Sequence, residues 1–202
     1  MLSKSRFGSA LALALVLSAS ASFAGKFNKV LDAGDKAPDF KGIIGTDDKK
    51  HSLDEYKDAA AVALVFTCNH CPVAIACEDR IIELQKAYKD KNVQVIAINV
   101  NNTEQDKLDM MKERVEQKGY NFPYLYDPTQ KVAKDFGARV TPDVVLLDKD
   151  RNVVYTGLID DAPLEPAKAQ KHYLRDAIDA VLAGKSPSTN ETKAQGCGIK
   201  FE

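Results

Sequence analysis

The stretch Phe66-Thr67-Cys68-Asn69-His70-Cys71-Pro72 decides the fold of this 202-residue chain. The apolar run 61–66 before it is typical of a buried strand, and a helical pattern follows over about 73–89. Two cysteines separated by two residues therefore lie at a strand-to-helix turn. The unpaired N–H groups and the dipole of a helix N-terminus stabilise a thiolate, which is the reactive form of cysteine. We expect Cys68 to be the more exposed nucleophile and Cys71 to resolve mixed disulfides formed on Cys68.

Two other uses of a C-x-x-C pair fit this chain less well. A structural zinc site needs four ligands, and the remaining cysteines, Cys77 and Cys197, form no second C-x-x-C. Covalent haem attachment needs a histidine directly after the second cysteine, where this chain has Pro72. We therefore predict no metal site and no cofactor.

The charge of the chain is balanced, with 28 Lys+Arg against 29 Asp+Glu. There is no arginine-rich run, so the sequence does not indicate nucleic-acid binding.

Residues 1–24 have the pattern of a secretory signal: Lys4 and Arg6, then the apolar stretch 11–17, then small residues before Gly25. The apolar stretch is shorter than the roughly 20 residues that span a bilayer. We expect cleavage near Ala24 and a periplasmic protein with no stable membrane insertion, in a compartment that permits disulfides.

The order of elements predicts an α/β protein. Strands alternate with helices, which implies parallel strands flanked by helices, and a late hairpin adds antiparallel edges. Residues 25–184 are expected to form one domain, and the polar, aperiodic segment after it predicts a flexible tail, 185–202, that carries Cys197. The expected elements are a hairpin in 41–52, a helical turn at 53–57, strands at 93–100, 122–126, 144–147 and 153–159, and helices at 103–118, 129–136 and 166–182.

The helix after the cysteine pair has one unusual residue on its apolar face. Glu78 interrupts this face and has no cationic partner three or four residues away. Either Glu78 lies at the edge of the face and reaches water, or it is a partly buried carboxyl that exchanges protons with Cys71. Cys77 lies on another face and is expected to be a buried residue or a second disulfide partner. The face consists of Cys71, Ala74, Ile75, Glu78, Ile81, Ile82 and Gln85.

Together with Thr141-Pro142 before the second hairpin, the C-x-x-C turn resembles the thioredoxin fold. The resemblance implies a three-layer α/β/α structure with a central mixed sheet, and a cis proline beside the cysteine pair. The long separation of Cys71 from Pro142 leaves room for an inserted βα unit. This insertion, together with the opening Ala37-Pro38-Asp39-Phe40, resembles the redoxin branch, which includes peroxiredoxins and TlpA/ResA-like exported thiol-disulfide proteins. The motif Cys-Asn-His-Cys-Pro and the ending Gly-Cys-Gly-Ile-Lys-Phe resemble a peroxiredoxin-like group of this superfamily.

The chain departs from the family patterns at two places. Peroxiredoxins carry P-x-x-x-T/S-x-x-C, and if Cys71 were the peroxidatic cysteine, Leu64 and Cys68 would replace the proline and the hydroxyl residue. The tryptophan that precedes C-x-x-C in many thioredoxins is Thr67 here. The first departure weakens a peroxidase function, and the second indicates a different substrate surface.

The function expected from these residues is an exported thiol:disulfide oxidoreductase that acts on protein thiols and disulfides together with a redox partner protein. We expect His70 to lower the pKa of Cys68 and so to make a Cys68–Cys71 disulfide more oxidising. Thr141 and Pro142 would present a backbone edge to an extended substrate.

Two alternatives remain open. One is a thiol peroxidase, because exposed thiols of low pKa also react with peroxides. The other is a copper-delivery protein with Cys68, Cys71 and His70 or His172 as soft ligands. Otherwise His51 and His172 are expected at the surface.

The disulfide pairing is predicted as follows. We favour a Cys68–Cys71 bond, with Cys77 or an external thiol facing Cys197. Cys197 is expected to take part in redox chemistry, because it lies between two glycines at the end of a flexible segment and could reach another sulfur. The alternative is a free cysteine in a disordered tail.

Overall fold

The structure is a computed structural model that describes residues 25–202, so the predicted signal 1–24 lies outside the described residues. A seven-stranded mixed sheet forms the centre, in the order β2-β1-β5-β4-β3-β7-β8, and β6 pairs with β9 in a separate two-stranded sheet. The strands are β1 Ile43–Gly45, β2 Lys50–His51, β3 Ala61–Thr67, β4 Val93–Asn99, β5 Tyr124–Tyr126, β6 Val140–Thr141, β7 Asp143–Asp148, β8 Val153–Gly157 and β9 Cys197–Gly198.

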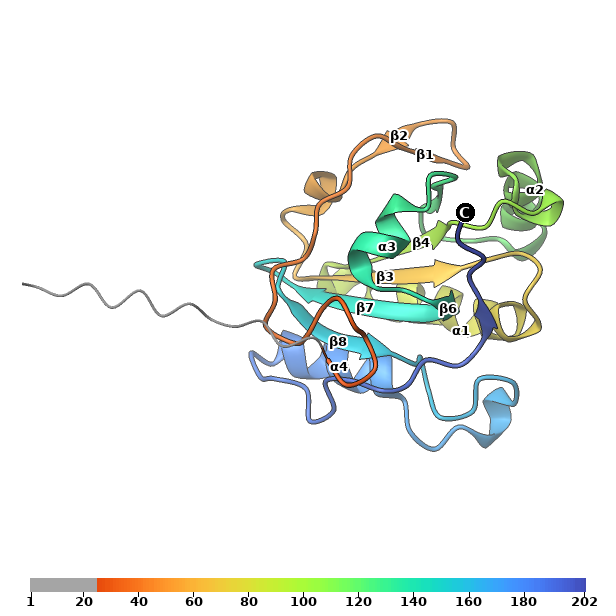
Figure 1. The fold of residues 1–202 in the computed structure, drawn as a ribbon. Helices are drawn as coiled ribbons and strands as arrows, with labels where there is room; N and C mark the ends of the chain where they lie inside the picture. The colour runs from red at the N-terminus through yellow and green to blue at the C-terminus, as the bar shows by residue number, and fades with distance from the viewer. Residues whose placement is uncertain (1–24) are drawn as a thin grey trace, which may run out of the picture.

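Helices cover both faces of the central sheet, which confirms the three-layer architecture (Figure 1). The central strand β3 is buried along its whole length. Its residues alternate between the two cores: Val65 packs with α1 and α4 on one side, and Phe66 packs with α3 on the other. The helices are α1 Pro72–Tyr88, α2 Leu108–Lys118, α3 Lys131–Phe136 and α4 Tyr173–Leu182, with 3-10 turns η1 Leu53–Tyr56, η2 Lys89–Lys91, η3 Glu104–Asp106 and η4 Pro166–Lys168.

Two helices, α2 and α4, begin at least five residues later than predicted. The helix expected from Thr103 is the turn η3 followed by α2, because Lys107 between them is extended. The helix expected over 166–182 is the turn η4 followed by α4, because the chain becomes extended at Ala169. The predicted end at Gly119 is confirmed, since this glycine takes the left-handed conformation, with φ of 67°.

The segment 185–195, expected to be a mobile linker, instead runs along β8. Thr156 donates its N–H to the Asn190 carbonyl at 3.0 Å and accepts the Thr192 N–H at 2.9 Å. The Glu191 carboxylate accepts the backbone N–H groups of residues 26–28 at the start of the domain. The expectation of a free tail was wrong because backbone hydrogen bonds and one carboxylate hold this segment, and neither produces an apolar periodicity.

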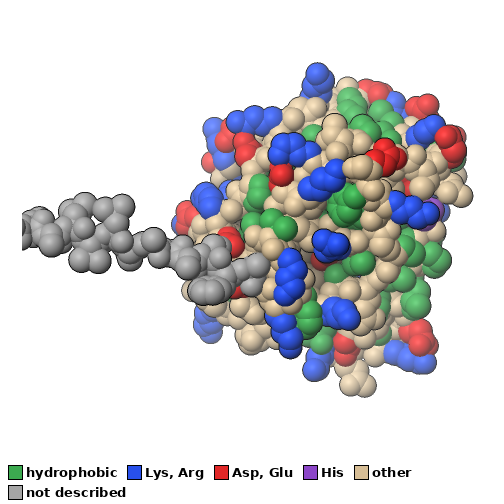
Figure 2. Space-filling model, viewed as in Figure 1, with side chains coloured by type: hydrophobic (Ala, Val, Ile, Leu, Met, Phe, Trp, Pro, Cys, Tyr) green, Lys and Arg blue, Asp and Glu red, His purple; other side chains and the backbone are tan. Residues whose placement is uncertain are grey.

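The surface on the face seen in Figure 2 mixes basic, acidic and hydrophobic side chains, with basic groups spread over it rather than gathered in one stripe. No helix among residues 25–202 combines the length and the apolar character needed to cross a membrane.

Candidate functional site

The cysteine pair lies where the predicted strand-to-helix turn placed it. β3 ends at Thr67, Cys71 precedes the first residue of α1, and Pro72 occupies that first position. Both cysteines are buried, however: Cys68 is 2% exposed and Cys71 is fully covered, with Cys197 packed against them. The prediction that Cys68 is the exposed cysteine of the pair is therefore wrong in this state of the molecule.

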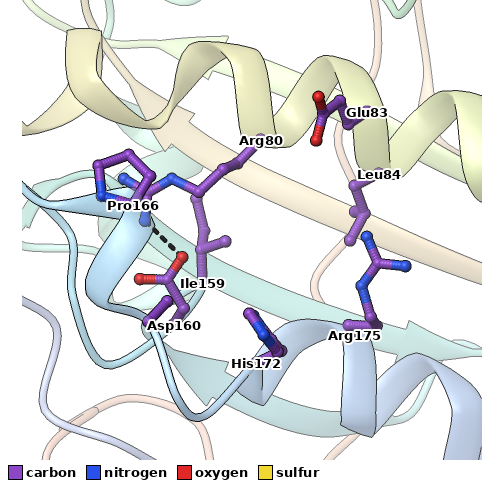
Figure 3. Close-up of a pocket in the computed structure, with 9 residues that line it drawn as sticks. Arg80, Glu83, Leu84, Ile159, Asp160, Pro166, His172 and Arg175 are labelled. Carbon is purple, nitrogen blue, oxygen red and sulfur yellow. Dashed lines mark hydrogen bonds and ion pairs between the residues drawn. The ribbon is translucent and has the colours of Figure 1, made fainter.

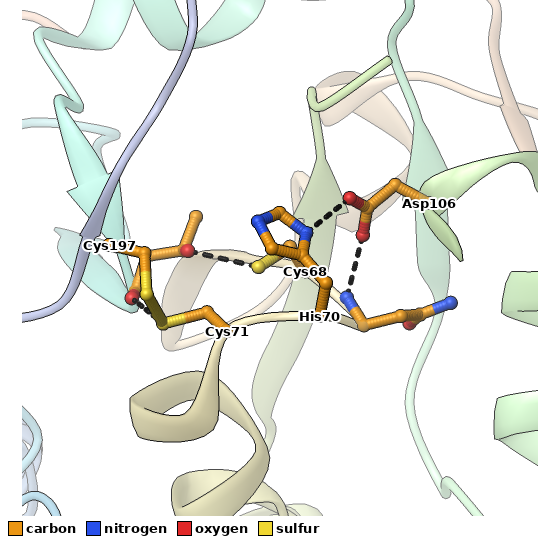
Figure 4. The surroundings of a disulfide bond; sticks show 7 residues. Cys68, His70, Cys71, Asp106 and Cys197 are labelled. Atoms are coloured by element: carbon orange, nitrogen blue, oxygen red, sulfur yellow. Dashed lines mark hydrogen bonds and ion pairs between the residues drawn. A yellow bond between two sulfur atoms is a disulfide. The ribbon is translucent and has the colours of Figure 1, made fainter. Parts of the chain in front are cut away.

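The disulfide joins Cys71 to Cys197, and Cys68 and Cys77 are free thiols (Figure 4). The predicted Cys68–Cys71 bond is therefore wrong for this structure, and so is the prediction that Cys77 or an external thiol faces Cys197. The Cα atoms of the bridged residues lie 5.8 Å apart although 126 positions separate them in sequence. They meet because the C-terminal segment follows β8 and then adds β9 beside β6, which places Cys197 opposite Thr141.

Thr141 and Pro142 lie against the cysteines, and the peptide bond between them is cis. The Thr141 hydroxyl is hydrogen-bonded to Cys68 Sγ at 3.0 Å. The Thr141 carbonyl oxygen lies 3.2 Å from Cys71 Sγ, which in the disulfide has no hydrogen to donate, so this is a packing contact. The edge that was predicted to bind a substrate strand is occupied in this structure by β9 of the same chain.

The C-terminal segment is fitted closely to this edge. A Cβ on Gly196 would lie 2.0 Å from the Thr141 carbonyl oxygen, so this position accepts only glycine without a backbone shift. Beyond Cys197, Ile199 donates its N–H to the Arg139 carbonyl at 2.9 Å. The Gln130 side chain donates to the Lys200 carbonyl at 2.8 Å and accepts the Glu202 N–H at 2.7 Å. Sequence reasoning found Cys197 but missed Gly196 and Gln130 as the residues that position it.

His70 is paired with a residue that the sequence reasoning missed. Its Nδ1 lies 2.5 Å from Oδ2 of Asp106, a fully buried carboxylate in η3 (Figure 4). Asp106 also accepts hydrogen bonds from the Thr103 hydroxyl at 2.6 Å, the Asn69 N–H at 2.7 Å and the Asn99 amide at 3.1 Å. The polar Asn99 at the end of a predicted strand was one signal that this edge contains site residues. The parallel strands β3 and β4 end at the same edge of the sheet, and Asn99 is in register there with Thr67.

The Cys68 thiol has its pKa raised, which is the opposite of the prediction. Burial is the largest cause, and the nearby Asp106 carboxylate acts in the same direction. The Thr141 hydroxyl and the backbone N–H groups of Cys71 and His70 favour the thiolate but do not overcome burial. Cys68 is therefore a protonated thiol at neutral pH when the tail is in place.

Glu78 is buried and fully partnered. Arg114 of α2 donates to its two carboxylate oxygens at 2.7 and 2.6 Å, and the Tyr120 hydroxyl donates at 2.9 Å. The interpretation as an edge residue that reaches water is wrong. The prediction that its own helix supplies no cation was correct, but α2 supplies Arg114. A carboxylate committed to these donors gives no support to proton exchange with Cys71.

Cys77 belongs to another core cluster than Cys68, Cys71 and Cys197, and its neighbour Arg80 lies at a pocket between α1, α4 and the loop before α4 (Figure 3). Arg80 lines this pocket, is paired with Asp160, and donates to Cys77 Sγ at 3.1 Å. Burial raises the pKa of Cys77 to about 11. Cys77 is thus an inert buried thiol and not the partner of Cys197.

The histidines differ from the prediction in one case. His172 is exposed, as expected, but His51 is buried, with its Nε2 3.0 Å from Asp47 Oδ1 and its Nδ1 3.3 Å from the Tyr56 hydroxyl.

For the copper alternative, Cys71 is held in the disulfide and is not free to bind a metal. Cys68, His70 and Asp106 offer ligand atoms within 4.8 Å of one another, but the Asp106 oxygens already accept four hydrogen bonds. We therefore assign no metal to this cluster.

Known proteins resemble this chain in sequence and in fold. The Redoxin family profile matches residues 32–172. The thiol-disulfide oxidoreductase ResA of Bacillus thuringiensis (strain Al Hakam) is 31% identical over 124 residues, which cover 61% of this chain and 68% of ResA. Two solved structures are also similar. A hypothetical protein from Sinorhizobium meliloti 1021 has a TM-score of 0.80 and 35% identity over 85% of this chain and 96% of its own. An uncharacterized conserved protein from Geobacillus kaustophilus has a TM-score of 0.79 and 36% identity over 84% of this chain and 92% of its own.

Proposed function

Because the chain belongs to the redoxin family, we propose that it is a thiol:disulfide oxidoreductase in which Cys68, Cys71 and Cys197 share one disulfide. The observation that carries this proposal is the Cys71–Cys197 bond beside the free thiol of Cys68. Exchange proceeds by attack of a thiolate on a disulfide sulfur, so a thiol packed against a disulfide is the arrangement that the reaction needs. Cys197 lies outside the matched residues 32–172, so the third cysteine is an addition to the matched region.

The proposed cycle begins with attack of Cys68 on Cys71. A Cys68–Cys71 bond forms, the Cys71–Cys197 bond breaks, and Cys197 leaves as a thiol. The strand β9 is then no longer held covalently and can leave β6. The edge at Thr141 and Pro142 becomes free for an extended segment of a protein substrate, which exchanges with the Cys68–Cys71 disulfide. A redox partner protein then resets the pair.

The thiol peroxidase alternative receives less support from the site. Peroxides react with exposed thiolates, whereas Cys68 is buried and has a raised pKa. If Cys71 is the reacting cysteine, the peroxiredoxin motif requires a threonine or serine three residues earlier. This chain has Cys68 at that position. Copper delivery is likewise less favoured, because its predicted ligand Cys71 is bridged to Cys197.

We further propose that the protein works in the periplasm after cleavage near Ala24. The support is the pattern of charged, apolar and small residues in 1–24 and the presence of a disulfide, which an oxidising compartment maintains. N-terminal sequencing of the protein from a periplasmic extract checks this, since an intact Met1 would exclude cleavage.

The test of the oxidoreductase function is trapping of a mixed disulfide. Reduced Cys71→Ser protein is mixed with a disulfide-bonded peptide, and adducts are located by mass spectrometry. We expect a peptide on Cys68, because Cys71, which would resolve this adduct, is gone. Cys77→Ser is the control and should turn over like the unsubstituted protein. Adducts on Cys197 or Cys77 with none on Cys68 would contradict the proposal.

A further inference from the structure

The proposed exchange faces an obstacle at its first step. Cys68 must attack as a thiolate, yet it is 2% exposed and burial raises its pKa. Water has little access to take the proton. A base inside the protein is therefore needed next to Cys68 while the tail is still closed.

The imidazole of His70 is placed to be that base. One ring nitrogen of His70, the Cys68 sulfur and one Asp106 carboxylate oxygen lie within 4.8 Å of one another. Figure 4 shows the His70 ring beside Cys68, with one ring nitrogen turned to Asp106. Because a carboxylate only accepts, Asp106 fixes the proton of the neutral ring on Nδ1, and Nε2 keeps its lone pair free to accept a proton.

Asp106 is held rigidly in this role. Its four donors come from three parts of the chain: the C-x-x-C loop, the end of β4, and Thr103 before η3. Its side chain is fully buried, while that of His70 is 29% exposed. A nucleophile, a base and a buried carboxylate that orients the base form the arrangement by which proteins activate weak nucleophiles.

Other titratable groups near Cys68 do not offer a base. Tyr124 of β5 donates its hydroxyl to Asn69, and burial raises its pKa well above the ordinary value. Glu78 is committed to Arg114 and Tyr120. Asp143 follows the cis proline, but it lines a separate pocket under the tail with Thr192, and burial raises its pKa to about 7.

We propose that His70, held by Asp106, takes the proton of Cys68 as Cys68 attacks Cys71, and then delivers it to Cys197. The Cys68 S–H bond breaks and Nε2 gains the proton. The Cys68–Cys71 bond forms while the Cys71–Cys197 bond breaks, and the Cys197 thiolate that leaves receives the proton. One thiol and one disulfide are present before and after, so the step needs no external oxidant or reductant. His70 is the catalytic group and Asp106 its positioning residue, and the inference rests on the proposed function.

The test measures how fast the two disulfide isomers interconvert. Fully reduced protein is oxidised with glutathione disulfide, quenched with acid at successive times, and mapped for Cys68–Cys71 and Cys71–Cys197 bonds. Since general acid–base catalysis typically contributes about 10²–10⁴-fold, we expect His70→Ala to slow interconversion at least about 10-fold at pH 7. Added imidazole should restore part of the rate. Asp106→Asn should also slow the step, and both deficits should shrink as the pH is raised, because hydroxide then replaces the base.

The matched control is His51→Ala. His51 is also a buried histidine hydrogen-bonded to an aspartate, but it lies in the hairpin β1–β2, so its loss should leave the rate within about twofold. Two results would overturn the inference: an unchanged rate in His70→Ala, or a loss that neither imidazole nor higher pH relieves. Failure of the unsubstituted protein to interconvert its isomers would instead overturn the proposed function itself.

Discussion

The environment of Glu78 could not be inferred from its own helix, because its ion-pair partner lies on another element. On its own helix it has no cation within reach, but α2 brings Arg114 against both carboxylate oxygens. Breaking a buried ion pair by removing one partner leaves the other charge uncompensated, which costs about 3–5 kcal/mol when both groups are buried. The side chain of Arg114 is 24% exposed, so the cost here should be smaller.

We expect Glu78→Gln to lower the free energy of unfolding by about 2–3 kcal/mol, with little effect on the rate of disulfide exchange. Urea denaturation measures the first quantity, and the isomer assay measures the second. Glu83→Gln is the control, because Glu83 is exposed on the same helix. A normal stability combined with a slow exchange would show that Glu78 serves the cysteines after all.

Residues of the site divide into those with a local sequence signal and those without one. Cys68, Cys71 and Pro142 could be predicted, because a C-x-x-C turn and a Thr-Pro before a hairpin are recognisable patterns. Asp106 could not be assigned to His70, because the two are joined only by the meeting of β3 and β4 at one edge. The pKa of Cys68 was predicted in the wrong direction because burial raises it, and one residue packed against the cysteine pair, Cys197, is distant in sequence.

Among the elements, the C-terminal strand β9 covers the edge at which we propose that substrate binds. It occupies the edge of β6 beside the cis proline, and its fit depends on the absence of a side chain at Gly196. The central strands were predictable from apolar runs that are buried on both faces. β9 was not predictable, because two residues paired through backbone atoms leave no pattern in the sequence.

Gly196→Ala should favour the isomer with an open tail. Its Cβ would overlap the Thr141 carbonyl, which is backbone and cannot turn away. Overpacking of this kind costs about 1–3 kcal/mol, so the ratio of Cys71–Cys197 to Cys68–Cys71 should fall by roughly 5- to 140-fold, at about 1.4 kcal/mol per tenfold. Disulfide mapping at equilibrium with glutathione gives the ratio.

Gly198→Ala provides the matched comparison in the same strand. A Cβ at Gly198 meets nothing within 4 Å, so its isomer ratio should stay close to that of the unsubstituted protein. Equal ratios for the two alanine variants would show that the close approach of Gly196 to Thr141 does not control the tail.

The fold brings segments that are distant in sequence together at one edge of the sheet. The C-x-x-C turn, the cis proline and the C-terminal strand meet there, from positions near 70, 140 and 197. Parallel strands flanked by helices could be predicted from the alternation of strands and helices, and the resemblance to the thioredoxin fold implied the three layers. The disulfide connectivity could not, because four cysteines allow three complete pairings and sequence alone does not choose among them.

In the proposed cycle, Cys71 is the shared member of two alternative disulfides. Disulfide mapping of the oxidised protein over a series of glutathione potentials tests it most directly, with each linked peptide assigned by fragmentation. We expect Cys71–Cys197 and Cys68–Cys71 bonds in exchange with each other, and a free Cys77 throughout. A Cys197 that is unlinked at every potential, or is linked to Cys77, would contradict it.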